Sequence, residues 1–223
     1  MARAGGVDRR HDPSTGPKTA FAALHGAFAG LCLWLAFGLD WPDPSRARLL
    51  AGLALLYWLR HLVTLFVFMK RRVEYREALG LAASIGFLDI GFLLLGAGAL
   101  SGTARPFGWP DGLALALVLL GSALNTISEA QRHAWKQRPD AEGCYTGGLF
   151  ALAMHINYFG DSLLFTGWAL LTGCMLTLAV PALMTVLFIF YHIPPLDAWL
   201  AARYGESFNA YAAKTARFVP FLY

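Results

Sequence analysis

The residue types that could do chemistry lie mainly in two short parts of the chain. One is the segment 155–161, in which a histidine, an asparagine and an aspartate precede a mainly apolar stretch. On a helix, Asn157 and Asp161 would share one face, and Gly160 between them would let a flat group approach the backbone. Free amides at the start of a helix attract anions. The segment therefore indicates an anion-binding site; the alternative is that Asn157 and Asp161 merely cap the helix.

The other part is a polar stripe on the helix expected before this segment. Its members recur at helical spacing, which places them on one face of a continuous helix: Asn125, Ser128, Glu129, Arg132 and Lys136. A stripe that carries both acid and base could bind a phosphate and a ribose. A simply solvated helix face is the alternative, because most runs of charge are solvated.

A few ionisable residues stand inside long apolar stretches, where each is costly unless it is paired or wet: His25, Arg60, His61 and Asp89. We expect Asp89 either to serve in a functional cavity or to pair with Arg60 or His61. Tyr57 precedes Arg60 by three positions, so both lie on one helical face beside His61. A buried phenol next to a cation is a candidate acid for polarising a carbonyl. The alternative is an interfacial tyrosine beside an arginine that snorkels to the membrane surface.

The composition indicates which elements must carry these residues. Apolar residues make up 57% of the 223 residues, charged residues 14%, and the mean hydropathy is +0.50. Soluble domains carry about 25% charge, so a cytosolic enzyme is excluded, as are disordered, collagen-like and disulfide-rich chains. The net charge of +4 comes from basic residues in short loops, which suits membrane topology better than nucleic-acid binding. The three cysteines are widely spaced and indicate neither a disulfide framework nor a metal site.

The expected fold class is all-α: a polytopic membrane bundle of about six transmembrane helices, each needing about 20 apolar residues. The stretches that qualify are 19–39, 47–69, 79–101, 111–128, 149–172 and 174–193. Only Thr172 and Gly173 separate the last two stretches, which predicts a tight helical hairpin. A polar segment, 1–18, precedes a single transmembrane domain, 19–223, whose C-terminal half, 125–223, holds most of the polar motifs.

The distribution of Lys and Arg predicts the orientation. With the N-terminus inside, the inner segments hold fourteen of these residues and the outer segments hold Arg46, Arg48 and Arg105. This is a clear positive-inside bias, so both termini are expected in the cytoplasm. High Ala, Gly and Arg content suggests a bacterial inner membrane.

Several motifs in order resemble the steroid 5-alpha-reductase family, its bacterial relatives of unassigned function and the related sterol reductases. The resemblance covers most of residues 125–223, with a weaker echo near 57–75. The matching motifs are Asn125-x-x-Ser128-Glu129, Gly147-Gly148-Leu149-Phe150, Asn157-Tyr158-Phe159-Gly160-Asp161, and a tail with Arg203-Tyr204-Gly205, Tyr211 and Val219-Pro220-Phe221.

This resemblance implies a nicotinamide cofactor, NADPH, at the cytoplasmic ends of the later helices. It implies cofactor contacts for Asn125, Glu129, Arg132, Lys136, His155, Asn157, Tyr158, Asp161, Arg203 and Tyr211. Tyr57 with Arg60 looks like the Tyr-x-x-Arg of the family's second helix, whose tyrosine hydrogen-bonds the substrate's carbonyl oxygen. Tyr57 and Asp89 are therefore candidate catalytic residues for reduction of a C=C bond in a lipophilic enone of steroid, sterol or isoprenoid type.

Departures from the family pattern leave other functions open. The steroid reductases pair that tyrosine with a Gln-Glu, and 19–39 contains neither residue, so Asp89 or His25 would have to assist. Two family arginines near the phosphates are replaced, at Met154 and around 194–195. One alternative is an S-adenosylmethionine-dependent methyltransferase of the isoprenylcysteine carboxyl type, which shares the Tyr-x-Gly element. Another is a non-catalytic membrane lipid-binding protein. The expected partners are a lipophilic small molecule and the bilayer.

Overall fold

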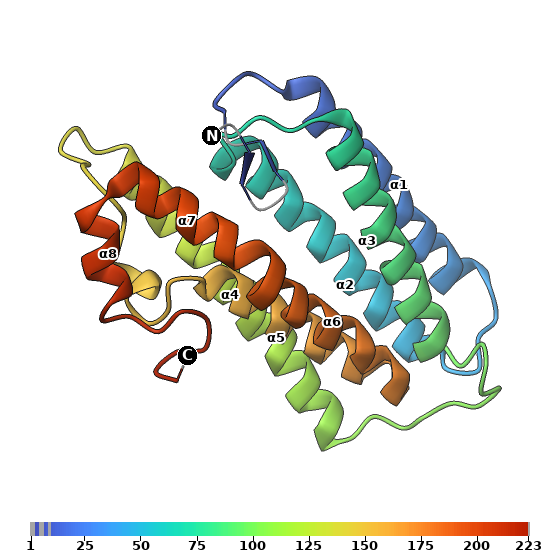
Figure 1. Ribbon diagram of the computed structural model, residues 1–223. Coiled ribbons are helices and arrows are strands. Elements are labelled where there is room, and N and C mark those ends of the chain that lie inside the picture. The colour runs from blue at the N-terminus through green and yellow to red at the C-terminus, as the bar shows by residue number, and fades with distance from the viewer. Residues whose placement is uncertain (1–2, 5–6, 9, 223) are drawn as a thin grey trace.

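The computed structural model describes residues 3–4, 7–8 and 10–222, and in this part of the chain nearly all regular structure is helical. The first three long helices, α1 (Thr15–Gly38), α2 (Pro44–Val63) and α3 (Tyr75–Gly96), pack against one another on one side of the molecule (Figure 1). Before them, the two-residue strands β1 (Arg3–Ala4) and β2 (Val7–Asp8) pair antiparallel. The expected all-α fold class is confirmed.

The second group of helices starts with α4 (Trp109–Lys136) and α5 (Ile156–Leu171), which lie antiparallel and in close contact (Figure 1). The helices that follow are α6 (Ala179–Leu187), α7 (Ile193–Tyr204) and the short α8 (Glu206–Ala212). A 3₁₀ turn, Gly148–Ala151, comes before α5. Since α5 also contacts α2 and α3, it joins the two groups of helices.

Five helical stretches are long and apolar enough to cross a membrane: Thr15–Gly38, Pro44–Phe68, Tyr75–Gly96, Trp109–Lys136 and Met175–Tyr204. The chain is thus a polytopic helical membrane protein. The sixth expected stretch, 149–172, contains the shorter helix α5, which has 16 residues. At 1.5 Å per residue, α5 is about 24 Å long, less than the roughly 30 Å hydrocarbon core. Its start is delayed because the preceding residues form the 3₁₀ turn instead.

The last apolar stretch continues further than expected, to Tyr204 rather than to residue 193. Pro194 and Pro195 do not stop it because they occupy the first turn of α7, where a missing N–H costs nothing. A π-helical turn, Phe188–His192, links α6 to α7. The tight hairpin between α5 and α6 at Thr172 and Gly173 is confirmed, and Gly173 has a positive φ of 73° there.

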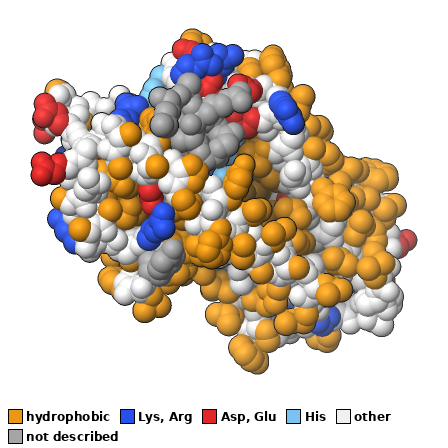
Figure 2. Space-filling view, viewed as in Figure 1, with side chains coloured by type: hydrophobic (Ala, Val, Ile, Leu, Met, Phe, Trp, Pro, Cys, Tyr) orange, Lys and Arg blue, Asp and Glu red, His pale blue; other side chains and the backbone are white. Residues whose placement is uncertain are grey.

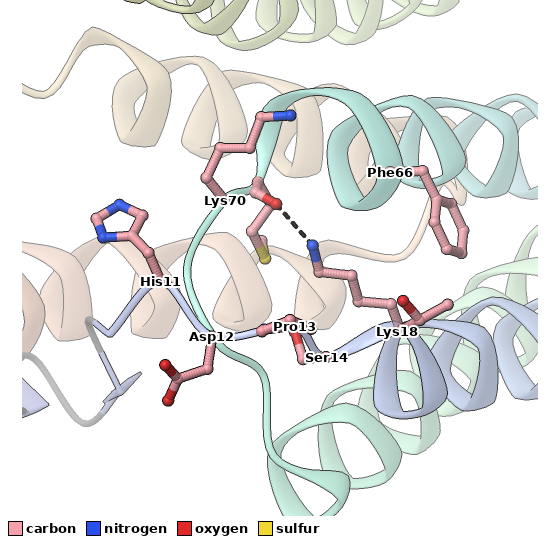
Figure 3. A pocket seen from close by; sticks show the side chains of 9 residues that line it. His11, Asp12, Pro13, Ser14, Lys18, Phe66 and Lys70 are labelled. Atoms are coloured by element: carbon pink, nitrogen blue, oxygen red, sulfur yellow. Dashed lines mark hydrogen bonds between the residues drawn. The ribbon is translucent and has the colours of Figure 1, made fainter.

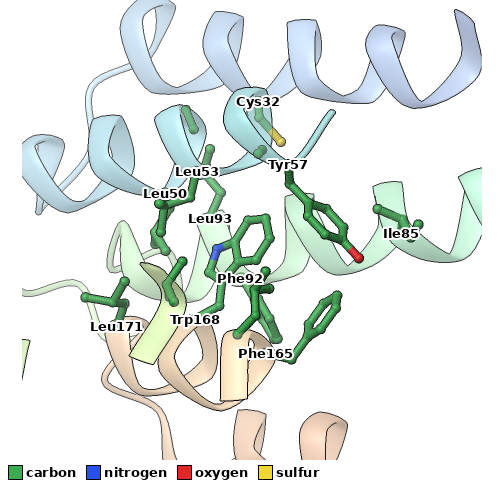
Figure 4. Close-up of a cluster of buried hydrophobic side chains, with 14 of the residues drawn as sticks. Cys32, Leu50, Leu53, Tyr57, Ile85, Phe92, Leu93, Phe165, Trp168 and Leu171 are labelled. Atoms are coloured by element: carbon green, nitrogen blue, oxygen red, sulfur yellow. The ribbon is translucent and has the colours of Figure 1, made fainter. Parts of the chain in front are cut away.

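The faces of the molecule agree with a membrane location. Figure 2 shows hydrophobic side chains over most of the helical bundle, with charged side chains gathered mainly near the N-terminal segment and the α7–α8 end. Inside, a core of mostly apolar side chains is shared by α1 to α5 (Figure 4). Trp168 of α5 and Leu50 of α2 are both 1% exposed, so the two groups of helices meet in a packed interior.

One arginine expected at the outer surface is instead buried. Arg46, 1% exposed, donates from Nη1 to Asp111 Oδ1 at 2.6 Å and to the Leu171 carbonyl at 2.7 Å, and from Nε to Asp43 Oδ2 at 3.3 Å. Its Nη2 donates to the Arg105 carbonyl at 3.1 Å. The guanidinium fork therefore fastens the start of α2 to the start of α4 and the end of α5.

Candidate functional site

A continuous chain of hydrogen bonds joins α2, α4 and α5. Arg60 Nη2 donates to Asp161 Oδ1 at 2.8 Å, and Asn125 Nδ2 donates to Asp161 Oδ2 at 2.9 Å. Asn125 Nδ2 also donates to the Asn157 carbonyl at 3.1 Å, and Asn157 Nδ2 donates to Glu129 Oε1 at 3.0 Å. We call these five residues the polar chain. It brings together the two polar motifs of the sequence.

The contacts of the polar chain rule out two of the alternatives left open by the sequence. The residue that precedes the first turn of α5 is His155, and neither Asn157 nor Asp161 caps the helix. Asp161 instead binds side chains of two other helices. Arg60 does not snorkel, since its side chain is 9% exposed and paired with Asp161.

Gly160 has a different role from the one expected. A Cβ atom there would lie 2.7 Å from the Gly121 carbonyl and 2.9 Å from the Asn125 amide of α4. The backbone of α4 thus takes the space that the sequence analysis reserved for a flat ligand group, and this prediction is wrong. Small residues permit such close helix contact in membranes, and the contact brings Asn125 within reach of Asp161.

The C-terminal end of the stripe on α4 is basic. Glu129 pairs with Arg132, whose guanidinium lies over the Phe150 ring, 5.7 Å from its centroid. Lys136 is exposed at the end of α4, within electrostatic reach of Arg132 and of Arg203 from α7. Arg203 is also exposed and lies over the Trp199 and Tyr204 rings, at 5.1 and 5.5 Å. Two elements distant in sequence therefore bring cations to one end of α4.

His155 and Tyr158 lie beside the polar chain and form their own contacts. His155 Nε2 is 2.8 Å from Asp197 Oδ1, and Arg217 Nε donates to Asp197 Oδ2 at 2.8 Å. The Tyr158 ring is stacked on the His155 ring, with centroids 5.8 Å apart, and on the Phe188 ring at 4.7 Å. Asp197 was not predicted as a site residue, although a lone carboxylate in a largely apolar helix was a usable signal.

The C-terminal tail completes this region through its backbone. Met154 N donates to the Ala216 carbonyl at 2.8 Å and His155 N to the Arg217 carbonyl at 3.1 Å. Residues 216–217 thereby hold the start of α5. Arg217 was expected only as one of the basic residues of the C-terminal tail, because no residue near it in the sequence marks Asp197 as its partner.

Tyr211 is placed apart from the polar chain. Its hydroxyl donates to the Phe150 carbonyl at 2.5 Å, which fastens α8 to the 3₁₀ turn of the Gly-Gly-Leu-Phe motif. The residue is 4% exposed, and burial raises the pKa of its phenol. Tyr211 thus holds the turn next to Arg132 rather than joining the polar chain.

The candidate catalytic residues lie in the interior between α1, α2 and α3. Asp89 Oδ2 is 3.2 Å from His25 Nε2. The partner of Asp89 is therefore His25, and the expected pairing with Arg60 or His61 is wrong. Asp89 misses them because α3 packs closely along α1, while Arg60 is paired with α5. Around the Tyr57 ring lie His61 at 4.4 Å, His25 at 5.8 Å and the Arg60 guanidinium at 5.0 Å. The shared face of Tyr57, Arg60 and His61 is confirmed.

A surface hollow lies elsewhere, between the N-terminal segment and the end of α2 (Figure 3). Its volume is about 270 Å³ and its lining includes His11, Lys18 and Lys70. Lys18 Nζ donates to the Met69 carbonyl at 2.6 Å, so the lysine ties α1 to the residue that follows the helical stretch Pro44–Phe68. None of the expected site residues lines this hollow.

The chain belongs to the family DUF1295, described as proteins of unknown function, which matches residues 91–215. This family is part of the steroid 5-alpha-reductase-like superfamily. A comparison with curated proteins found no match. The matched residues include α4, α5 and α7, and hence every member of the polar chain except Arg60.

Proposed function

Starting from membership of DUF1295, we propose that the protein is an integral-membrane reductase that uses NAD(P)H to reduce a C=C bond in a lipophilic enone. One observation carries the proposal. The polar chain joins four residues, Asn125, Glu129, Asn157 and Asp161, for which the family resemblance implies cofactor contacts. These residues come from two helices and are far apart in sequence, so their assembly needs a reason beyond local structure.

The donor set suits a dinucleotide. Carboxylates and amides such as Glu129 and Asn157 bind ribose hydroxyls, and cations bind phosphates. Lys136 at the end of α4 and Arg203 of α7 are exposed and would bind a phosphate, while Glu129 is half-buried. These side chains would hold the cofactor, which when bound supplies a hydride.

The interior residues would act on the substrate. The Tyr57 phenol would donate a hydrogen bond to the carbonyl oxygen and stabilise the negative charge that develops on it. The Arg60 guanidinium, 5.0 Å from the Tyr57 ring, favours that charge further. The packed helices around Tyr57, which is 8% exposed, exclude bulk water and orient the double bond.

Binding of the nucleotide tests the proposal first. Detergent-purified protein is titrated with NADPH, NADH and S-adenosylmethionine, and saturable binding of NADPH is expected. Asn157→Ala should weaken that binding, whereas Asn209→Ala, at an exposed position of α8, should not. Saturable binding of S-adenosylmethionine alone would reject the reductase and favour the methyltransferase. Binding of neither would favour a lipid-binding protein without catalysis.

Reaction with an enone is the second test. A long-chain alkyl cyclohexenone in mixed micelles should be reduced at the double bond with matching oxidation of NADPH. Tyr57→Phe should lower kcat by on the order of 10²-fold or more, since it removes one oxyanion donor. An unchanged rate in Tyr57→Phe would remove Tyr57 from the mechanism.

A further inference from the structure

Buried polar atoms that lack a hydrogen-bond partner gather around Tyr57. Among the described residues, six buried side-chain nitrogen or oxygen atoms are unpaired, and one of them is the Ser14 hydroxyl. The remaining five are His25 Nδ1, Arg60 Nε and Nη1, His61 Nδ1 and Trp168 Nε1. All four of their residues lie against the Tyr57 ring, the indole of Trp168 at 5.6 Å between centroids.

This grouping is informative because folded proteins pair nearly all buried polar atoms, with protein or with ordered water. The residues come from three helices, α1, α2 and α5, so no single strained turn accounts for them. Figure 4 shows Tyr57 reaching from α2 into the core that also holds Trp168 of α5. The unpaired atoms thus belong to residues that all lie against one ring, and any bound partner that they share would occupy the space beside it.

The chemistry of these atoms limits what can fill the space. The Arg60 and Trp168 nitrogens can only donate, whereas an imidazole nitrogen donates or accepts according to its protonation. Water suits both kinds of partner, and buried waters typically make about three such bonds. A further anion is disfavoured, because the carboxyl groups of Asp89 and Asp161 already bind His25 and Arg60 here.

We propose that bound water fills this space and links the His25–Asp89 pair to the Tyr57 hydroxyl, providing a route for the proton that the reduction consumes. Through this water, His25 of α1 and Asp89 of α3 act on the Tyr57 hydroxyl. His25 and Asp89 are positioning residues, since they act through Tyr57. The hydration stands on the geometry alone, and its catalytic use rests on the proposed function.

The reaction balances in protons and electrons. A bound nicotinamide cofactor would supply the hydride for the new C–H bond at the β-carbon, and its own oxidation would balance the reduction of the double bond. The Tyr57 O–H bond breaks as the substrate oxygen gains that proton. His25, paired with Asp89, returns a proton to Tyr57 through the water and regains one from solvent. The enol relaxes to the ketone with no further net proton.

Hydration of the histidine rings is measured independently of enzymatic activity. Protein labelled with ¹⁵N-histidine is studied in lipid bilayers by solid-state NMR, with magnetisation transferred from water to the ring nitrogens. His25→Gln and His61→Gln identify the two signals, and the exposed His11 is the hydrated reference. We expect transfer to His25 and His61 at mixing times comparable to that of His11. The proposal would be overturned if His11 received magnetisation from water and the rings of His25 and His61 received none.

Kinetics tests the catalytic use. His25→Gln and Asp89→Asn should keep the NADPH Kd and the enone KM, and should lower kcat by about 10²-fold, the usual contribution of a positioned acid. The pH dependence of kcat should also change in both variants. The ionisable groups that surround Tyr57 and could contribute to this dependence are His25, Arg60, His61, Asp89 and Asp161. His11→Gln is the matched control and should behave as wild type.

The outcomes separate the two proposals. Variants with wild-type kcat and pH profile, in a protein that reduces the enone, would overturn the proton route and leave the reductase standing. A protein that neither binds NADPH nor reduces the enone would overturn the reductase, and NMR would still decide the hydration. Circular dichroism melting of each variant identifies a loss of folding, and Asp89→Asn offers a second, smaller change if His25→Gln is unstable.

Discussion

Arg60 and Asp161 form a largely buried ion pair, 2.8 Å long, between helices whose residues are 101 positions apart. The pair is the first link of the polar chain and the direct connection between Tyr57 and the family motifs. Its position, one turn after Tyr57 on α2, makes the tyrosine and the α4–α5 polar residues parts of one structure.

Breaking this pair should be strongly destabilising. Arg60→Met leaves the Asp161 carboxylate buried without its cation, and removal of one partner of a buried pair costs about 3–5 kcal/mol. Arg60→Met with Asp161→Leu should recover part of the loss, because no charge is left unpaired. Thermal unfolding in detergent measures both. Equal stability of the wild type and Arg60→Met would show that the pair does not hold the two groups of helices.

The contact between α4 and α5 at Gly160 should be intolerant of a methyl group. Gly160→Ala places a Cβ against the α4 backbone and should cost about 1–3 kcal/mol, as overpacking does. Gly112→Ala is the matched control on α4, since its Cβ would meet nothing within 4 Å. This variant should be neutral or slightly stabilising. Retained activity with a lowered melting temperature would assign Gly160 to packing alone.

Replacement of Arg46, at the start of α2, by lysine should destabilise the protein. Arg46→Lys keeps the charge but cannot reach two carboxylates and two carbonyls, so a loss of about 3 kcal/mol is expected. The control is Arg48→Lys, at an exposed position two residues further along α2, which should change the unfolding free energy by less than about 0.5 kcal/mol. Similar losses in the two variants would contradict a special role for Arg46.

Stability should fall at alkaline pH through Tyr211. Burial raises the pKa of its phenol in the folded protein, so above the unfolded pKa of about 10 only the unfolded chain ionises readily. The contribution of the raised Tyr211 pKa to the free energy of unfolding is therefore complete below pH 10 and is lost as the pH rises further. Denaturation at pH 8 and pH 10.5 should show a smaller decrease in Tyr211→Phe than in wild type. At pH 8 this variant should be about 1 kcal/mol less stable, having lost one hydrogen bond.

Lys136 should discriminate between nicotinamide cofactors. If the basic end of α4 binds the additional phosphate of NADPH, Lys136→Ala should weaken NADPH binding about tenfold, the equivalent of one charge-assisted bond, and NADH binding much less. Lys214→Ala, at an exposed position after α8, is the control. Equal effects on both cofactors would place the phosphate elsewhere.

Much of the fold was predictable because helical periodicity and hydropathy act locally. The continuous helix carrying Asn125 to Lys136 and the hairpin at Gly173 follow from spacing and turn chemistry alone. The shared face of Tyr57 and Arg60 follows from three-residue spacing. Each of these depends on residues within a few turns of one another.

The partners of the polar residues were not predictable in the same way. Periodicity tells which face of a helix Asp89 occupies, but not that α1, with His25, lies against that face. Likewise Gly160 is a small residue in any reading, and only the packing of α4 shows that a backbone, not a ligand, fills its space. Such facts depend on how helices are arranged, which one sequence leaves open.

The backbone bonds from residues 216–217 to the start of α5 have a consequence for biogenesis. The chain emerges from the ribosome in order, so α5 is synthesised well before residues 216–217, whose carbonyls accept from the amides of Met154 and His155 directly before it. The segment that leads into α5 thus reaches its final form only after synthesis of the tail, and a ribosome stalled earlier would hold a bundle whose long helices are complete but whose entry into α5 lacks these two bonds.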